Sequence, residues 1–349
     1  MIKITEGNLL TADVEALVNT INCVGYMGKG IALQFKKAFP ANFSEYKKAC
    51  NNNEVMPGRM LVHETGHLVN PKYIINFPTK RHWKGKSRIE DIEIGLQALV
   101  EEIEKRKIKT IAIPPLGCGY GGLDWNDVRP LIESAFAGLE DVEVLMYEPI
   151  ETPEPKTMPI GTQKPSLTLA RALIIELIAQ YSQLAYRLTL LEIQKLAYFL
   201  QEADEPLRLK YEAGTYGPYA HNLNFLLENL EGHYIRGYGD NQNPDTDIEL
   251  LPTAKFQAEV FLKDHADSRI RLKNVSELIE GFETPYGMEL LSSVHWVAVH
   301  SNPSATDKKD AIELVHHWNK RKKKMFKQEH IVIAWERLVE EGWLARRIR

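Results

Sequence analysis

The chain has few cysteines, no long apolar run and no excess of basic residues. Only Cys23, Cys50 and Cys118 occur in 349 residues, and their spacing matches neither a disulfide framework nor a cysteine-based metal site. No window approaches the roughly 18 apolar residues of a membrane span, and the N-terminus, "MIKITEGNLL", has no apolar core of a signal peptide. We therefore expect a soluble, cytoplasmic protein with no metal, no cofactor and no membrane partner.

The charge balance limits the class of partner. The 43 Lys and Arg residues are offset by 47 Asp and Glu residues, which gives a net charge of -4. A broad basic surface for a long duplex is therefore excluded, and any contact with nucleic acid should be local.

A proline-rich segment divides the chain. Residues 149–165 read "PIETPEPKTMPIGTQKP", with five prolines, and proline at this density favours a semi-rigid linker. Residues 1–148 and 166–349 are then two domains, each long enough to bury a core. Strands predicted at 16–22, 59–64, 72–77, 110–115 and 142–147 alternate with helices at 30–39, 87–107 and 125–136, the second opened by a Ser87–Glu90 capping box. This alternation predicts an α/β fold of three layers around a mixed, largely parallel sheet.

The pattern after the linker is mainly α-helical. Helices are predicted at 166–185, 189–203, 253–265, 285–300, 307–319 and 327–341, and strands only at 232–239 and in the final residues. Thr189 and Glu192 form a capping box at the second of these helices. The basic run "NKRKKKMFK" at 319–327 is interpreted as a solvated helix face or end, with contact to an acidic partner as the alternative.

Two glycine-rich loops each lie between a strand and a helix. They read "NCVGYMGKGIALQF" (22–35) and "PPLGCGYGGLDW" (114–125). Glycine lets the backbone approach a ligand closely, and the first turn of a helix offers free amides to an anion. Because ligands collect at the carboxyl ends of parallel strands, the two loops predict a pyrophosphate site. Neither loop is closed by Gly-Lys-Ser/Thr, which argues against a nucleoside triphosphatase.

These loops, together with "EALVNTIN" (15–22) and "INFPTK" (75–80), resemble the macrodomain family in its terminal ADP-ribose glycohydrolase-like branch. The resemblance covers residues 1–148 and implies that Lys80 is the catalytic residue at the anomeric carbon, that Asp13 contacts the adenine end and that Asn22 faces the distal ribose. The alternatives are that Asp13 caps a turn, that the Asn22 amide serves the loop backbone and that Cys118 is a packing residue. The residues implied to bind ADP-ribose are Asn8, Leu9, Asp13, Asn22, Gly28, Lys29, Gly30, Ile31, Thr79, Pro115, Leu116, Gly117, Cys118, Gly119, Tyr120 and Gly121.

One position departs from that branch. Human-type members pair the lysine with an aspartate in the second loop, where this chain has Gly121, and the next acid, Asp124, is expected to cap a helix. Lys80 would then act without that partner, either as a neutral amine attacking the anomeric carbon or as a charge that stabilises a departing base. Burial, or the nearby Arg81 and Lys84, would lower its pKa. His82 and Trp83 either contact the modified substrate or are ordinary surface and packing residues.

The second domain resembles the SocA-like, or Panacea, antitoxin family through "LEIQKLAYFLQE" (191–202) and the "YGPY" turn (216–219). Gln194, Lys195, Tyr198 and Tyr219 are interface or core residues, with Tyr198 expected in the core. The combination resembles the antitoxins of DarT-type toxins, which attach ADP-ribose to thymine in single-stranded DNA. It implies an ADP-ribosyl glycohydrolase acting on ADP-ribosylated single-stranded DNA, with residues 166–349 binding and inhibiting the toxin. The alternatives are a non-catalytic ADP-ribose-binding macrodomain, a deacylase or phosphatase of ADP-ribose derivatives, and a DNA-binding helical domain.

Overall fold

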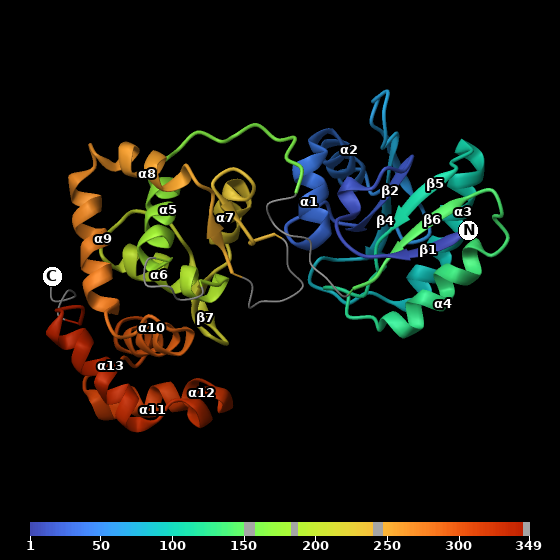
Figure 1. Cartoon of the computed structure of the whole chain (residues 1–349). Coiled ribbons are helices and arrows are strands. Elements are labelled where there is room, and N and C mark those ends of the chain that lie inside the picture. The colour runs from blue at the N-terminus through green and yellow to red at the C-terminus, as the bar shows by residue number, and fades with distance from the viewer. Residues whose placement is uncertain (150–157, 183–187, 240–246, 345–349) are drawn as a thin grey trace. The chain divides into compact units, whose positions relative to one another are not determined.

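The computed structural model describes residues 1–149, 158–182, 188–239 and 247–344 (Figure 1). Contacts within the chain divide it into two compact units, of which the first is built on Met1–Lys164 and the second begins at Pro165. Residues 150–157 of the expected linker lie outside the described part of the chain.

The first unit contains a six-stranded sheet in the order β1-β6-β5-β2-β4-β3. All neighbouring strands are parallel except β3, which is antiparallel to β4. The strands are β1 (Ile2–Thr5), β2 (Ala16–Asn22), β3 (Leu61–Glu64), β4 (Tyr73–Lys80), β5 (Thr110–Ile113) and β6 (Glu143–Tyr147). This is the mixed, largely parallel sheet expected from the sequence.

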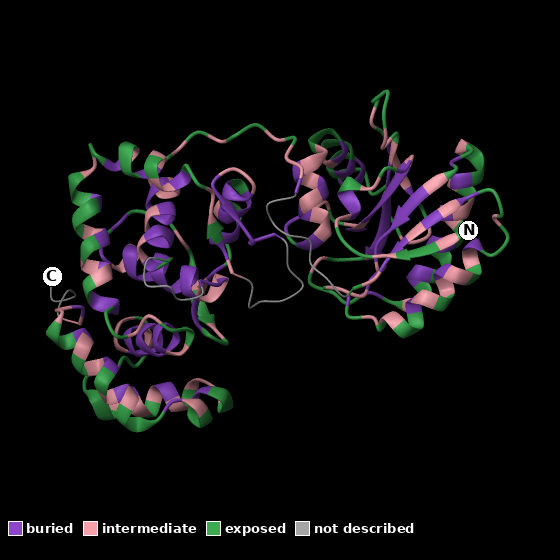
Figure 2. Cartoon of the chain, viewed as in Figure 1, coloured by how far each residue is buried: buried purple, intermediate pink, exposed green. Residues whose placement is uncertain are grey.

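Helices cover both faces of this sheet, because its central strands are apolar on both sides. One face packs against α3 (Ile89–Arg106) and α4 (Trp125–Phe136), and the other against the 3-10 turn η1 (Leu9–Thr11), α1 (Gly30–Ala38) and α2 (Pro40–Asn51). Neighbouring residues of β2 serve opposite faces: Val18 belongs to the first cluster and Leu17 to the second. Figure 2 shows the strands as the most continuously buried part of this unit.

Strand β1 and helix α2 of this unit were not predicted, and the N-cap of α3 was predicted wrongly. Strand β1 is short and half exposed, and α2 begins at Pro40, which looks like a helix end in the sequence but is tolerated in the first turn of a helix. The N-cap of α3 is Arg88 rather than Ser87. The Ser87 amide instead donates to the carbonyl of Gly121, so Ser87 serves the second glycine loop.

The described end of the proline-rich segment packs against the first unit. Met158 is buried beside Leu9 and Tyr147, and the amide of Gly161 donates to the carbonyl of Lys37 at 2.7 Å. A side chain at Gly161 would meet the carbonyl oxygen of Ala38 at 2.4 Å. Met158 is therefore part of the core of the unit, and exposed Gly161 packs closely against the end of α1. The sequence suggested that little in this segment could pack.

The second unit is mainly α-helical, as expected. Its helices are α5 (Leu169–Ser182), α6 (Leu190–Glu202), α7 (Leu223–Leu230), α8 (Ala254–Leu262), α9 (Ala266–Ile279), α10 (Pro285–Val299), α11 (Lys308–Trp318), α12 (Lys320–Met325) and α13 (Gln328–Glu340). Short strands are β7 (Tyr211–Gly214), β8 (Gly217–Ala220), β9 (Ile235–Arg236) and β10 (Glu249–Leu250). Helices α7, α9 and α12, the β7–β8 hairpin and β10 were not predicted, and the strand expected at 232–239 is reduced to two residues. A further strand was expected in the final residues, of which 345–349 lie outside the described part of the chain.

Helix α6 holds the β7–β8 hairpin. Gln194 accepts from the amide of Ala220 at 2.9 Å and donates to its carbonyl at 3.1 Å, so its amide replaces a strand neighbour. The buried Nζ of Lys195 donates to the carbonyl of Pro218 at 2.6 Å. The turn expected at "YGPY" lies earlier in the chain, between the end of β7 at Gly214 and the start of β8 at Gly217. Tyr198 is fully buried and 2.7 Å from Nδ1 of His295, which confirms its place in the core.

The basic run at 319–327 is not a uniform solvated face. Most of its cations are exposed, but Lys322 is fully buried and donates from Nζ to Glu289 at 2.7 Å and to Ser293 at 2.9 Å. Exposed Arg321 shares the same carboxylate at 2.6 Å. A buried lysine needs such a partner, so this residue is structural.

The capping box at Thr189 gives the first testable consequence. The Thr189 amide donates to the buried carboxylate of Glu192 at 2.9 Å, and its hydroxyl accepts from the amide of Leu191 at 3.3 Å. We expect Thr189→Ala to lower the free energy of unfolding by about 1 kcal/mol, as loss of an N-cap does. Urea unfolding followed by circular dichroism measures this, with Thr189→Ser as the matched control that keeps the cap. An unchanged midpoint in Thr189→Ala would contradict the assignment.

Candidate functional site

Strands β2 and β4 end side by side, and their last residues are the two polar residues expected at the sugar. Asn22 pairs with Lys80 after an irregularity in the register at Ile21 and Asn22. The amide of Cys23 donates to the carbonyl of Lys80 at 3.0 Å. The first glycine loop therefore begins beside Lys80, at the carboxyl edge of the sheet.

The side chain of Asn22 organises the first glycine loop. Its Oδ1 accepts from the amide of Val24 at 3.0 Å, and its Nδ2 donates to the carbonyl of Tyr26 at 2.5 Å. The hydroxyl of Tyr46, which is fully buried in α2, donates to the carbonyl of Asn22 at 2.8 Å and lies 3.1 Å from its Oδ1. The structure thus places this amide in the loop backbone, which is the alternative that the sequence left open. No sequence pattern indicated the hydrogen bond of Tyr46 to Asn22.

Tyr46 is therefore a positioning residue with a measurable effect. We expect Tyr46→Phe to lower the free energy of unfolding by about 1 kcal/mol, because one buried hydrogen bond is lost with little change in volume. It should also weaken ADP-ribose binding severalfold as the loop loosens. Calorimetry with ADP-ribose and thermal unfolding measure the two effects, and Tyr73→Phe, at the start of β4 and away from the loop, is the control. Unchanged affinity would show that the loop holds its shape without this hydroxyl.

The two glycine loops approach each other through Tyr120. A side chain at Gly30, which has φ of +57°, would lie 3.4 Å from the Tyr120 ring, and Nζ of Lys29 lies 5.9 Å from the centre of that ring. In the first loop, a side chain at Gly28 would overlap the ring of Tyr26 at 2.3 Å. Glycine at these positions lets the rings of Tyr26 and Tyr120 pack closely against the loop backbone.

The second loop is a tight turn closed on itself. The amide of Leu123 donates to the carbonyl of Gly117 at 3.1 Å, and Gly117 has φ of +72°. A Cβ at Gly121 would lie 2.1 Å from the carbonyl oxygen of Gly117 and 2.3 Å from Oγ of Ser87. The position where human-type relatives have an aspartate therefore cannot hold a side chain in this loop. Asp124 caps α4 by accepting from the amide of Asn126 at 2.9 Å, as expected.

Lys80 reaches across to this second loop. Its Nζ donates to the carbonyl of Tyr120, so the amine lies between the two glycine loops. Burial lowers its pKa below the usual value for lysine. The neighbouring Arg81 forms a two-pronged ion pair with the buried carboxylate of Asp91, at 2.9 and 3.2 Å. Of the two causes expected from the sequence, burial is the one that lowers the pKa of Lys80, rather than the charges of Arg81 and Lys84.

The remaining residues with expected roles do not all lie at this edge. Asn8, which follows β1, caps η1 by accepting from the amide of Leu10. Asp13 lies just before β2, at the edge of the sheet opposite the glycine loops, and accepts from Asn70 at 2.8 Å. Leu9, Thr79 and Leu116 are buried. Burial raises the pKa of the Cys118 thiol to about 12, and its Sγ lies 3.5 Å from the carbonyl of Leu116, so it is a packing residue and a poor nucleophile.

An aromatic cluster follows Lys80. The ring of Trp83 lies 5.5 Å from that of His82, in a stacked arrangement, and 5.4 Å from that of Tyr26 in the first glycine loop. Nζ of Lys84 lies 5.0 Å from the centre of the Trp83 ring. His82 and Trp83 were expected near the substrate, whereas Tyr26 was not singled out, although "YMGKG" places it within the loop.

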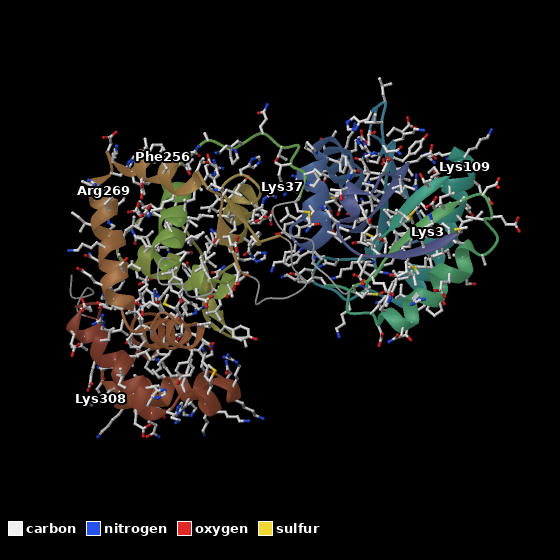
Figure 3. The ribbon with its side chains drawn as sticks, in the orientation of Figure 1. Lys3, Lys37, Lys109, Phe256, Arg269 and Lys308 are labelled. Atoms are coloured by element: carbon white, nitrogen blue, oxygen red, sulfur yellow. The ribbon has the colours of Figure 1, made fainter. Side chains whose placement is uncertain are left out.

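Other classes of site are not indicated in the described ranges. In residues 1–149, 158–182, 188–239 and 247–344, no group of three or more His, Cys, Asp or Glu side chains is arranged to hold a metal ion. None of the helices described is long and apolar enough to span a membrane. Figure 3 labels Lys3 and Lys109 on the outside of the first unit. Lys3 pairs with Glu143. Lys109 precedes β5, so it lies at the edge of the sheet opposite the glycine loops.

Comparison with known proteins places this site in a family. A Macro domain model matches residues 18–132. The "DNA ADP-ribosyl glycohydrolase" of Thermus aquaticus is 46% identical over 344 residues, which cover 99% of this chain and 94% of that protein. A "DNA ADP-ribosyl transferase-DNA ADP-ribosyl glycohydrolase fusion protein" of Thermosipho africanus is 36% identical over 165 residues, 43% of this chain and 42% of that protein. The solved macrodomain of Mycobacterium tuberculosis DarG is 54% identical and covers 43% of this chain and 98% of its own, with a TM-score of 0.42.

The agreement with the Thermus aquaticus protein extends over nearly the whole of both chains, so it includes the helical unit as well as the macrodomain. The chain therefore belongs to the DNA ADP-ribosyl glycohydrolase family.

Proposed function

We propose that residues 1–148 form a glycohydrolase that removes ADP-ribose from thymine bases of single-stranded DNA. The observation that carries this proposal is the amine of Lys80 at the meeting point of two glycine loops. The names of the relatives support the activity and the DNA substrate. Thymine and the single strand come from the resemblance described above. Removal of ADP-ribose would leave an unmodified thymine. This would be a direct repair of DNA, which we place in the cytoplasm.

The glycine loops would hold the diphosphate and leave the sugar beside Lys80. Backbone amides at Gly28–Ile31, where α1 begins, and at Gly117–Gly121 would bind the phosphate oxygens. Asn8 and Leu9, which follow the carboxyl end of β1, would contact the adenine end. The contact expected of Asp13 is not proposed, because this residue lies beside Asn70 at the opposite edge of the sheet. Thr79, Pro115, Leu116 and Cys118 would shape the walls. In this assignment Asn22 acts on the distal ribose through the loop that it organises.

The chemical step requires the neutral amine of Lys80. Nζ would attack the anomeric carbon while the bond from this carbon to the base breaks and the base leaves with the electron pair. The base then takes a proton from water or from the new ammonium group. Water next displaces the amine from the anomeric carbon, which releases ADP-ribose and restores Lys80. Burial favours this step, because it lowers the pKa of Lys80 and so raises the neutral fraction.

A release assay tests the activity directly. The wild-type chain is incubated with an ADP-ribosylated thymidine oligonucleotide, and chromatography should show free ADP-ribose and the unmodified oligonucleotide. Cyanoborohydride added during the reaction should leave a protein heavier by reduced ADP-ribose if the sugar ring opens on the amine. Binding of ADP-ribose without any release would instead make the first unit a reader of the modification.

The second unit has a separate proposed role. We propose that residues 166–349 bind and inhibit a DarT-type DNA ADP-ribosyltransferase. The relative that joins a transferase to a glycohydrolase in one chain supports the pairing of the two activities. The test adds the full chain carrying Lys80→Ala to such a transferase and measures modification of an oligonucleotide. Unaltered transferase activity and no complex on gel filtration would refute this role.

A further inference from the structure

We propose that Tyr26, His82 and Trp83 form a stacking platform for the modified base and its neighbour in the strand, and that Lys84 contacts the adjacent backbone phosphate. This inference rests on the proposed function and assigns the part of the substrate beyond the scissile bond. We refer to these three rings as the aromatic platform. Its rings lie next to one another at 5.4 and 5.5 Å.

The place of the aromatic platform follows from the strand ends. Asn22 and Lys80 pair at the ends of β2 and β4, so the segments that follow them, which carry Tyr26 and Trp83, leave the sheet from neighbouring points. The bond to be cleaved lies at Lys80, with the diphosphate held on the side of the glycine loops. The base must lie on the other side of that bond, where residues 82–84 directly follow the lysine. Tyr26 belongs to the first glycine loop, with its ring over Gly28, and meets this segment through Trp83.

The segment that carries the platform is fixed at several points. Arg81 is tied to Asp91 of α3 by two hydrogen bonds. The amide of Gly85 donates to the carbonyl of His82 at 2.9 Å, and the amide of Lys84 lies 3.2 Å from Nδ1 of the same residue. The backbone of this segment and the His82 ring are therefore held in place before substrate binds, which reduces the entropy lost on binding.

The chemistry of the cluster fits a nucleobase better than a protein acceptor. Every base offers a π-face, and aromatic side chains bind single strands by stacking on successive bases. His82 is exposed and Trp83 partly exposed, so the cluster is accessible from solvent. The chain as a whole has a net charge of -4, and recognition by rings does not require the broad basic surface that it lacks. Lys84, exposed beside Trp83, supplies a single positive charge for a phosphate.

Binding measurements on an inactive background test the aromatic platform independently of hydrolysis. The labelled, modified oligonucleotide is titrated by fluorescence anisotropy into Lys80→Ala and into Lys80→Ala with Trp83→Ala. We expect the second change to weaken binding about 10- to 100-fold, as loss of a stacked base does, and Trp83→Phe to restore most of it. Affinity for free ADP-ribose, measured by calorimetry, should stay within about twofold in all three proteins.

Steady-state kinetics add a second readout. In the active protein, Trp83→Ala should raise KM for the modified oligonucleotide far more than it lowers kcat. Lys84→Ala should reduce the slope of log K against log[salt] by about 0.7, the value for one phosphate of a single strand. Equal oligonucleotide affinity with and without the Trp83 ring would overturn the platform, and so would a parallel loss of affinity for free ADP-ribose. Absence of release by the wild type would instead defeat the proposed function and leave the binding result intact.

Discussion

Lys80→Ala is expected to reduce kcat for release of ADP-ribose from a modified oligonucleotide by about 10²- to 10⁴-fold, the range typical for loss of a group that acts in the chemical step. Affinity for free ADP-ribose should change little, because the glycine loops keep their own backbone hydrogen bonds when the single contact of Nζ with the Tyr120 carbonyl is lost. Single-turnover release and calorimetry measure the two quantities. A variant that lost binding and release together would indicate a structural role for Lys80.

The matched control for this substitution lies in the segment that follows Lys80. Lys86 is exposed and six residues further along the chain, so Lys86→Ala removes the same charge without touching the strand end. Release should stay within about twofold of the wild-type rate, as surface substitutions away from special features have small effects. Lys80→Arg keeps a charge but supplies no neutral amine at accessible pH. It should therefore be as inactive as Lys80→Ala if the amine attacks the sugar.

The pH dependence separates the two roles that the sequence left open for Lys80. Because burial lowers its pKa, the neutral amine appears at lower pH than in free lysine. A reaction that needs the neutral amine should rise in rate with pH and level off above that lowered pKa. A reaction that needs the ammonium charge should fall in rate over the same interval. We expect the rising profile, and a profile that falls through this interval would assign Lys80 to stabilisation of the departing base.

The central parts of the fold were predictable because their signals are local. Strand β2 and helix α4 begin and end where their apolar patterns do, and the Thr189 capping box is present as expected. Strand β1 and the β7–β8 hairpin could not be found in this way. The first is a short, half-exposed strand, and the second depends on Gln194 and Lys195, whose bonds to Ala220 and Pro218 cross more than twenty residues.

The same distinction applies to the candidate site. The glycines and Lys80 could be located from sequence, since the glycine loops follow strands, Lys80 ends one, and motifs of this kind lie on consecutive residues. Tyr46 lies in α2, which was not predicted, and it reaches Asn22 across 24 positions of sequence. Ser87 carried a plausible capping pattern, yet its amide binds the second glycine loop. Roles that depend on packing between distant segments leave no pattern along the chain.

Gly121→Asp, which introduces the acid found in human-type relatives, is expected to damage the site rather than improve it. A Cβ at this position would lie 2.1 Å from the carbonyl oxygen of Gly117, which is backbone and cannot swing away. We expect a loss of about 3 kcal/mol in the free energy of unfolding, the upper range for an overpacked position. For a unit of this size that loss corresponds to a Tm lower by roughly 6–12 °C.

The control for this change is Gly138→Asp, which adds the same charge where no atom lies within 4 Å of the new Cβ. Its Tm and its rate of release should remain close to those of the wild type. Gly121→Ala separates shape from charge, because it introduces the Cβ without the carboxylate, and it should lose nearly as much stability as Gly121→Asp. A stable Gly121→Asp protein with faster release would mean that the loop opens to admit the side chain. In that case Lys80 would work with an acid, and the mechanism proposed for a lone amine would be wrong.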